Sequence, residues 1–180
     1  MARDYMQMYN EKLKTAKEVA SKVQPGEWIE IGMFNNKSVA FERELAARKD
    51  ELNNMVVITA VTFPPIPEVL IKDPKGEVFT FIDCHFSPVS RIIQENRGNM
   101  YYNPTNFGEN EDWMSLKEDD PDKIGTNCRD WAVARVTPMD KDGYFNYGLS
   151  NAGTWTLFTT SKHAVVEVCQ TMPYCYGGAR

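Results

Sequence analysis

The run from Met55 to Thr62 constrains the fold of this chain more than any other segment. Its residues (MVVITAVT) are apolar or β-branched, and polar residues do not alternate with apolar ones. A strand buried on one face shows such alternation, whereas a strand buried on both faces does not. We therefore expect a central strand of a mostly parallel sheet, which the proline-rich segment from Phe63 to Pro67 ends.

Other short apolar segments alternate along the chain with segments of helical periodicity. Further strands are expected at residues 28–31, 78–82, 100–102, 131–136 and 164–168. Helices are expected at residues 5–23, 38–48, 88–96 and 154–162, the first divided by a capping box of Thr15 and Glu18 and the second capped by Ser38. This order predicts the α/β class, as an open, mostly parallel sheet with flanking helices. Residues 103–127, rich in Asn, Gly and acidic side chains, are expected to be flexible.

Size and charge exclude several classes of protein. A length of 180 residues with no internal boundary indicates one domain, residues 1–180. The net charge of -5 argues against a nucleic-acid surface, which needs clustered Lys and Arg. No apolar run approaches the roughly 20 residues that cross a membrane, and Met1–Tyr5 does not begin a signal peptide. The cysteines have no zinc spacing, so we expect no metal, no disulfide framework, a cytoplasmic location, and buried thiols at Cys84 and Cys169.

In parallel α/β sheets, ligands bind outside the carboxyl ends of the strands. This rule selects four loops, at residues 32–37, 62–67, 85–87 and 146–153. Their hydrogen-bonding side chains are candidates for binding a carboxylate or a thioester: Asn35, Asn36, Thr62, His85, Ser87, Ser150 and Asn151. The competing interpretation is that such residues cap helices and fill turns, where Ser, Thr and Asn are also favoured.

Three motifs with chemical meaning are rejected on their spacing. Gly148–Ala152 nearly matches the nucleophile elbow of esterases, but only His163, expected at the surface near a helix end, follows it and is too close to return as a base. Cys84 and His85 are adjacent in an extended segment, so their side chains point to opposite faces and form no dyad. Asp140–Gly143 mimics a calcium loop, but the EF-hand register lacks its end ligands, so its aspartates are expected to shape a turn.

The most distinctive segment is Thr137–Gly148, TPMDKDGYFNYG, which is close to a family sequence SPMDKHGYFNFG. Further segments follow in the order found in the same family: Tyr9–Leu13, Gln24–Trp28, Leu45–Leu52, Phe79–Thr80 with His85–Ser87, and Ala164–Val168 with Met172–Pro173. The chain thereby resembles the N-terminal domain of the acetyl-CoA hydrolase and 4-hydroxybutyrate, butyrate or acetate CoA-transferase family. The resemblance covers nearly the whole chain but only the first part of the family's length.

The resemblance implies an enzyme of acetyl-CoA and short-chain fatty acid metabolism. Such a CoA-transferase moves coenzyme A between an acyl-CoA (acetyl-, butyryl- or 4-hydroxybutyryl-CoA) and a small free carboxylate, through a glutamyl-CoA intermediate. The family's glutamate lies in a second domain that this sequence does not contain, so no residue here is expected to be catalytic. The CoA thioester is a substrate, and no cofactor is bound tightly. The expected partners are a C-terminal catalytic domain or subunit and, in a homo-oligomer, further copies of the chain.

Two departures from the family predict a changed acyl pocket. The segment after Tyr101 and Tyr102 lacks the family's arginines, and Ser150–Gly153 lacks its histidine. Cys175–Arg180 follows the last predicted strand with nothing to cap the sheet, so we expect a fragment or one part of a split enzyme. Two alternatives stay open: an acyl-CoA hydrolase of the same fold, and a noncatalytic acyl-CoA-binding or interaction subunit.

Overall fold

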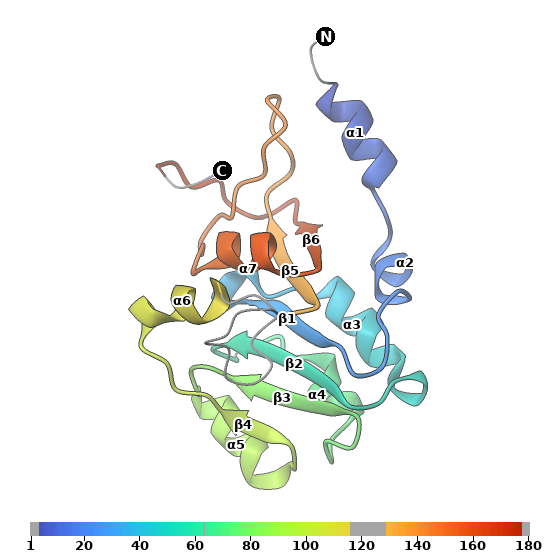
Figure 1. Cartoon of the computed structure of the whole chain (residues 1–180), viewed down its shortest axis with the longest axis vertical. Coiled ribbons are helices and arrows are strands. Elements are labelled where there is room, and N and C mark those ends of the chain that lie inside the picture. The colour runs from blue at the N-terminus through green and yellow to red at the C-terminus, as the bar shows by residue number, and fades with distance from the viewer. Residues whose placement is uncertain (1–3, 63, 116–128, 178–180) are drawn as a thin grey trace.

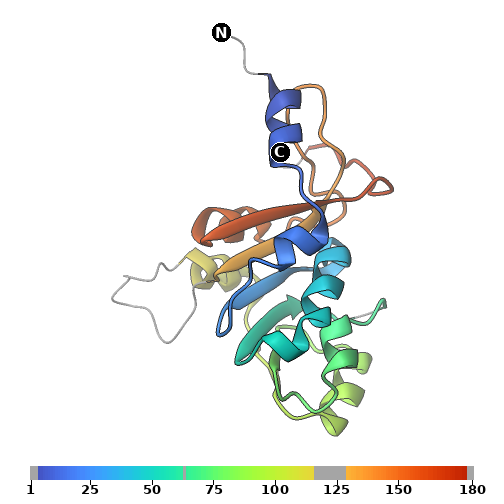
Figure 2. The same ribbon diagram turned by 90° about the vertical axis from the view of Figure 1, so that its right-hand side faces the viewer.

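The computed structural model describes residues 4–62, 64–115 and 129–177. Six parallel strands form one open sheet in the order β4-β3-β2-β1-β5-β6, with helices on both faces (Figures 1 and 2). The strands are β1 (Trp28–Met33), β2 (Met55–Ala60), β3 (Phe79–Asp83), β4 (Met100–Tyr102), β5 (Trp131–Val136) and β6 (His163–Val168). The predicted fold class is therefore confirmed.

The helices also follow the prediction in most places. They are α1 (Tyr5–Lys12), α2 (Ala16–Ala20), α3 (Ala40–Ala47), α4 (Glu68–Lys72), α5 (Pro88–Asn96), α6 (Asn110–Ser115) and α7 (Thr154–Thr160), with short 3₁₀ helices η1 (Phe34–Asn36), η2 (Lys49–Glu51) and η3 (Phe107–Glu109). A capping box of Thr15 and Glu18 begins α2, as predicted.

One local expectation is wrong. Ser38 does not cap α3, whose N-cap residue is Val39 and has no side-chain cap bond. Within the segment expected to be flexible, residues 107–115 form η3 and α6, while residues 116–128 lie outside the described part of the chain.

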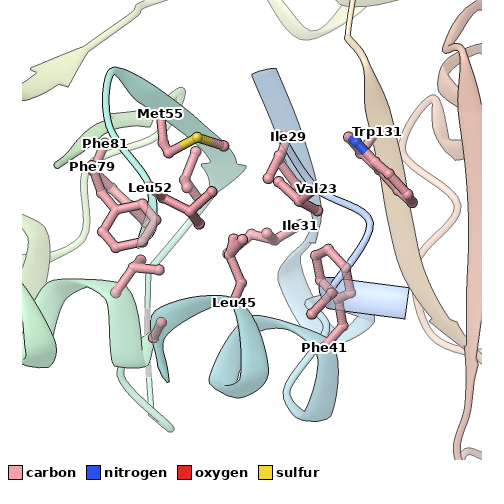
Figure 3. Close-up of a cluster of buried hydrophobic side chains, with 14 of the residues drawn as sticks. Val23, Ile29, Ile31, Phe41, Leu45, Leu52, Met55, Phe79, Phe81 and Trp131 are labelled. Atoms are coloured by element: carbon pink, nitrogen blue, oxygen red, sulfur yellow. The ribbon is translucent and has the colours of Figure 1, made fainter. Parts of the chain in front are cut away.

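The sheet is buried between two layers of helices. Every residue of β2 is buried, because side chains pack on both of its faces, as its uninterrupted apolar run predicts. On one face, Phe41 and Leu45 of α3 pack in a large apolar cluster with residues of β1, β2, β3 and β5 (Figure 3). On the other face, Met114 of α6 and Leu157 of α7 pack in a smaller cluster with β1, β2 and β5. Cys84 and Cys169, expected to be buried, are only partly buried.

The order of the strands reverses at β1. The chain builds β2, β3 and β4 on one side of β1, and then β5 and β6 on the other. Strands β1 and β5 pair only at Ile29 with Trp131 and at Glu30 with Ala132, although they continue to Met33 and Val136. Pairing is therefore absent at the carboxyl ends of these two strands, where an α/β sheet forms its ligand crevice.

Helix α1 and the turn after β5 extend from the body of the protein side by side (Figures 1 and 2). The rings of Tyr9 and Phe145 lie 6.1 Å apart between their centroids. The Oδ1 atom of Asp140 accepts hydrogen bonds from the N–H groups of Asp142 and Tyr144, each at 2.9 Å, so Asp140 shapes this turn as predicted. Among the described helices, none has the length and apolar character needed to cross a membrane.

Candidate functional site

The predicted candidate residues lie on loops at the carboxyl edge of the sheet, because all six strands run in the same direction. Asn35 and Asn36 follow β1, Thr62 follows β2, His85 and Ser87 follow β3, and Ser150 and Asn151 lie between β5 and α7. The structure divides them into two groups. One group gathers around the ends of β2 and β3, and the other lies where β1 and β5 separate.

Asp83, the last residue of β3, organises the first group. Its side chain is fully buried (0% exposed). Its carboxylate accepts hydrogen bonds from the N–H groups of Val61 (2.9 Å), Thr62 (3.1 Å) and His85 (3.1 Å). It also accepts from the hydroxyls of Thr62 (2.8 Å) and Ser90 (2.6 Å). Sequence reasoning missed Asp83, and the available signal was a carboxylate ending an apolar strand, where burial requires partners.

Two side chains of this group turn toward the protein interior. Thr62 is fully buried, and its hydroxyl donates a hydrogen bond to the carboxylate of Asp83. Ser87 caps α5, because its Oγ accepts from the N–H of Ser90 at 3.1 Å and donates to the carbonyl of Thr62. The side chain of His85 is exposed at the edge of the sheet. Of these three candidates, His85 is the one that a ligand could reach directly.

Of the two candidates after β1, Asn36 organises the second group. The side-chain Nδ2 of Asn36 donates to the carbonyl oxygens of Tyr147 (2.7 Å) and Ser150 (2.5 Å). It thereby joins the loop after β1 to the loop after β5. The Oδ1 atom of Asn36 is buried with no hydrogen-bond partner among the described residues. Asn35 is exposed, and its carbonyl accepts from Nη2 of Arg135 at 3.2 Å.

The loop that Asn36 holds carries Ser150 and Asn151. Ser150 is partly exposed and Asn151 is exposed. The carbonyl of Asn151 accepts from the N–H of Thr154 at 2.6 Å, which leads the chain into α7. Gly32 allows η1 to fold back closely against the end of β1, since it has a φ of 85° and a Cβ there would lie 2.4 Å from the carbonyl oxygen of Asn36.

Two buried charges lie beside the loop after β2. The Nζ of Lys37 donates to the carbonyl of Pro65 at 2.9 Å, and burial lowers the pKa of Lys37 to about 8. Oε1 of Glu42 accepts from the N–H of Val69 in α4 at 2.6 Å, and burial raises the pKa of Glu42 to about 7. Both groups therefore change charge closer to neutral pH than exposed side chains of their type do.

Two further carboxylates, those of Glu167 and Glu30, have partners elsewhere in the chain. Glu167 accepts hydrogen bonds from the N–H groups of Val39 and Phe41 at the start of α3. Glu30 is buried within β1, where burial raises its pKa, and its Oε2 lies 3.4 Å from Nε of Arg129. Among the described residues, no group of three or more His, Cys, Asp or Glu side chains could hold a metal ion. Beside the ends of β1 and β5, Ser150 and Asn151 offer neutral hydrogen-bonding side chains, and the guanidinium of Arg135 lies at Asn35.

Comparisons with known proteins agree with this architecture. The family model for the acetyl-CoA hydrolase/transferase N-terminal domain matches residues 1–179. A probable butyrate:acetyl-CoA coenzyme A-transferase of Syntrophomonas wolfei is 33% identical over 178 residues, which are 99% of this chain and 37% of that protein. The butyryl-CoA:acetate CoA-transferase of Anaerostipes caccae is 30% identical over 175 residues, which are 97% of this chain and 37% of that protein. The chain thus spans little more than a third of the length of these relatives.

Solved structures show the same fold. RipA from Yersinia pestis superposes with a TM-score of 0.81 at 24% identity, over 97% of this chain and 40% of that chain. A 4-hydroxybutyrate CoA-transferase from Porphyromonas gingivalis superposes with a TM-score of 0.65 at 18% identity, over 97% of this chain and 37% of that chain. At these identities the likeness concerns the fold alone.

Proposed function

Because the chain belongs to the acetyl-CoA hydrolase/transferase N-terminal domain family, we propose that it forms one wall of an active site that transfers coenzyme A between an acyl-CoA and a free carboxylate. The names of the curated relatives make butyryl-CoA and acetate the first pair of substrates to test. The nucleophile, a glutamate, would come from the part of the relatives that lies beyond the aligned residues. We call that part the companion region.

The observation that carries this proposal is the reversal of strand order at β1, which brings the loops after β1 and β5 together at the carboxyl edge of the sheet. Asn36 fixes the loop of Ser150 and Asn151 beside the end of β1 through two hydrogen bonds. Neutral amides and hydroxyls can orient a thioester carbonyl or a carboxylate without neutralising the charge that the reaction must move. The rim therefore suits a positioning surface whose nucleophile arrives from elsewhere.

The chemistry assigns distinct tasks to the two parts. The glutamate carboxylate of the companion region attacks the carbonyl carbon of the acyl thioester. The CoA thiolate departs, and a mixed anhydride of the acyl group and the glutamate remains. The thiolate then attacks the glutamyl carbonyl, which releases the first carboxylate and leaves glutamyl-CoA. A second carboxylate reverses these steps and departs as its own acyl-CoA. The wall formed by this chain would orient the acyl group and exclude water, since water attack on glutamyl-CoA gives hydrolysis.

The test mixes the purified chain with the separately purified companion region of the Syntrophomonas wolfei relative and follows the loss of butyryl-CoA with and without acetate. We expect no turnover by the chain alone and acetate-dependent formation of acetyl-CoA by the mixture. Equal loss of butyryl-CoA in both conditions would favour the hydrolase. Binding of CoA by an inactive mixture would favour the noncatalytic subunit, and turnover by this chain alone through one of its own glutamates would contradict the proposal.

A further inference from the structure

Strand β6 leaves one side of its backbone unpaired. It is the last strand of the sheet, and no strand in the described ranges lies beyond it. The N–H of His163 donates to the carbonyl of Asp130 at 2.8 Å, and the N–H of Cys169 donates to the carbonyl of Val136 at 2.9 Å. Because backbone groups alternate in direction along a strand, residues 163, 165, 167 and 169 bond to β5. Ala164, Val166 and Val168 therefore direct their N–H and C=O groups outward.

A groove of about 720 Å³ borders this edge, between β6 and the N-terminal helices. Leu13 and Val19 line its helical side, and Met139 and Phe145 line the side of the turn after β5. Leu13 is 54% exposed, and α1 buries none of its residues. Edge strands are normally protected by charged side chains, proline or a covering element. Here the outward positions of the strand are apolar, and the flanking helix has an unburied apolar surface.

The rim of the groove is basic. Lys12, Lys14 and Lys22 lie along it, and no Glu or Asp among the described residues lines it. His163, the first residue of β6, is exposed at one end of the groove, and its ring lies tilted against that of Trp131 with 4.3 Å between the ring centroids. The location predicted for His163, at the surface near a helix C-terminus, is thus confirmed, since α7 ends at Thr160 with Ser161 as its C-cap residue. A segment that fits this groove would be extended, apolar at alternate positions and acidic at its flanks.

We propose that this edge pairs with a strand of the companion region, which would extend the sheet by one strand. The inference rests on the proposed function, because that function requires a companion. The relatives have 37% of their length aligned with this chain, so most of their residues are available as occupant. The chain runs only nine residues from Val168 to Gly177, and Asn146 holds Cys175 through its Nδ2 at 2.9 Å and its Oδ1 at 3.2 Å. Cys175 is thereby fixed beside the loop after β5, to which Asn146 belongs.

Amide hydrogen exchange followed by NMR on the isotope-labelled full chain tests this pairing. The probe is the companion region of the Syntrophomonas wolfei relative. On addition of the probe, we expect exchange at Ala164, Val166 and Val168 to slow at least tenfold. The N–H groups of Val165 and Glu167, already bonded to β5, should change little. This alternation distinguishes strand pairing from general burial of the edge.

A lysine substituted into either edge strand of the sheet gives a test variant and its matched control. Val166→Lys should weaken binding of the companion region at least tenfold, because the added charge opposes edge pairing. Tyr101→Lys, on the opposite edge strand β4, should change binding less than twofold. Unaltered exchange at the three outward amides, with or without binding, overturns the proposal. Acetate-dependent turnover with no protection of these amides would refute edge pairing and leave the proposed transferase function intact. Protection of the amides without turnover would support edge pairing and refute the transferase function.

Discussion

The carboxylate of Glu167 on β6 accepts a hydrogen bond at 3.0 Å from the backbone N–H of Phe41, in the first turn of α3. It also accepts one from the N–H of Val39, through Oε1 at 3.0 Å. A helix N-terminus favours a negative charge and needs acceptors for its free N–H groups. The cap that sequence reasoning assigned to Ser38 is thus supplied by a residue from the last strand, which fixes β6 and α3 relative to each other.

Glu167→Ala should lower the free energy of unfolding by about 1 to 2 kcal/mol, the usual loss when a helix cap is removed. Ser38→Ala is the matched control, because the buried Oγ of Ser38 has no partner among the described residues and its removal should cost almost nothing. Urea denaturation of both variants measures the difference. A larger loss of stability for Ser38→Ala than for Glu167→Ala would indicate that Ser38 caps α3.

Asp83→Ala should destabilise the fold by about 3 kcal/mol or more, since several buried donors lose a charged acceptor at once. Asp142→Ala, at an exposed position in the turn after β5, should change stability by less than about 0.5 kcal/mol. Thermal and urea unfolding provide the comparison. Equal stability of the two variants would mean that the loops after β2 and β3 are held by other contacts.

Gly32→Ala should cost more than Gly26→Ala. Both glycines have a positive φ, of 85° and 84°, so alanine adds about 1 to 2 kcal/mol of backbone strain at either position. Only at Gly32 would the new Cβ also meet backbone, at 2.4 Å from the carbonyl oxygen of Asn36, whereas nothing lies within 4 Å at Gly26. Unfolding experiments that find equal losses would show that η1 can move away without cost.

The contribution of Glu42 to the free energy of unfolding should fall as the pH rises from about 4.5 to about 7. The folded state keeps the proton of Glu42 up to a pKa of about 7, whereas the unfolded chain releases it near the ordinary value of 4.5. The folded state therefore binds more protons across this interval, and the loss reaches roughly 3 kcal/mol at most.

Glu42→Gln tests this coupling, because glutamine cannot ionise and the decline should become shallower. Glu44→Gln, at a partly exposed position of the same helix, serves as the control and should leave the profile unchanged. Unfolding free energies measured at several pH values between 4.5 and 8 give both profiles. Identical profiles for Glu42→Gln and the unaltered protein would contradict the assignment.

Ser150→Ala and Asn151→Ala should each lower kcat/KM of the reconstituted mixture about tenfold, as expected when an orienting hydrogen bond of roughly 1.4 kcal/mol is lost. Their melting temperatures should stay unchanged, since both side chains lie at the rim. Asn53→Ala, exposed at the opposite, amino edge of the sheet, is the control for activity. A fall in melting temperature with unchanged turnover would support the turn-forming role instead.

The elements of the fold could be predicted because their signals are local. The apolar run of β2 predicted a strand buried on both faces, and Thr15 and Glu18 predicted the capping box that separates α1 from α2. The candidate loops could be placed at one edge for the same reason, since parallel strands end on the same side. The roles of individual residues were less accessible, as the inward-facing hydroxyl of Thr62 shows.

The sequence by itself determined the six strands, most of the helices, the parallel sheet and the loops at its carboxyl edge, because side-chain periodicity and turn residues act over a few positions. It did not indicate α4 or α6. Only the tertiary structure decided that Asp83 gathers the loops after β2 and β3, that Asn36 joins loops 111 residues apart, and that Glu167 caps a helix 126 residues away. The physical reason is that a buried polar group must find its partner in space. Strands β1 and β5 became neighbours through the reversal of strand order, which no local pattern records.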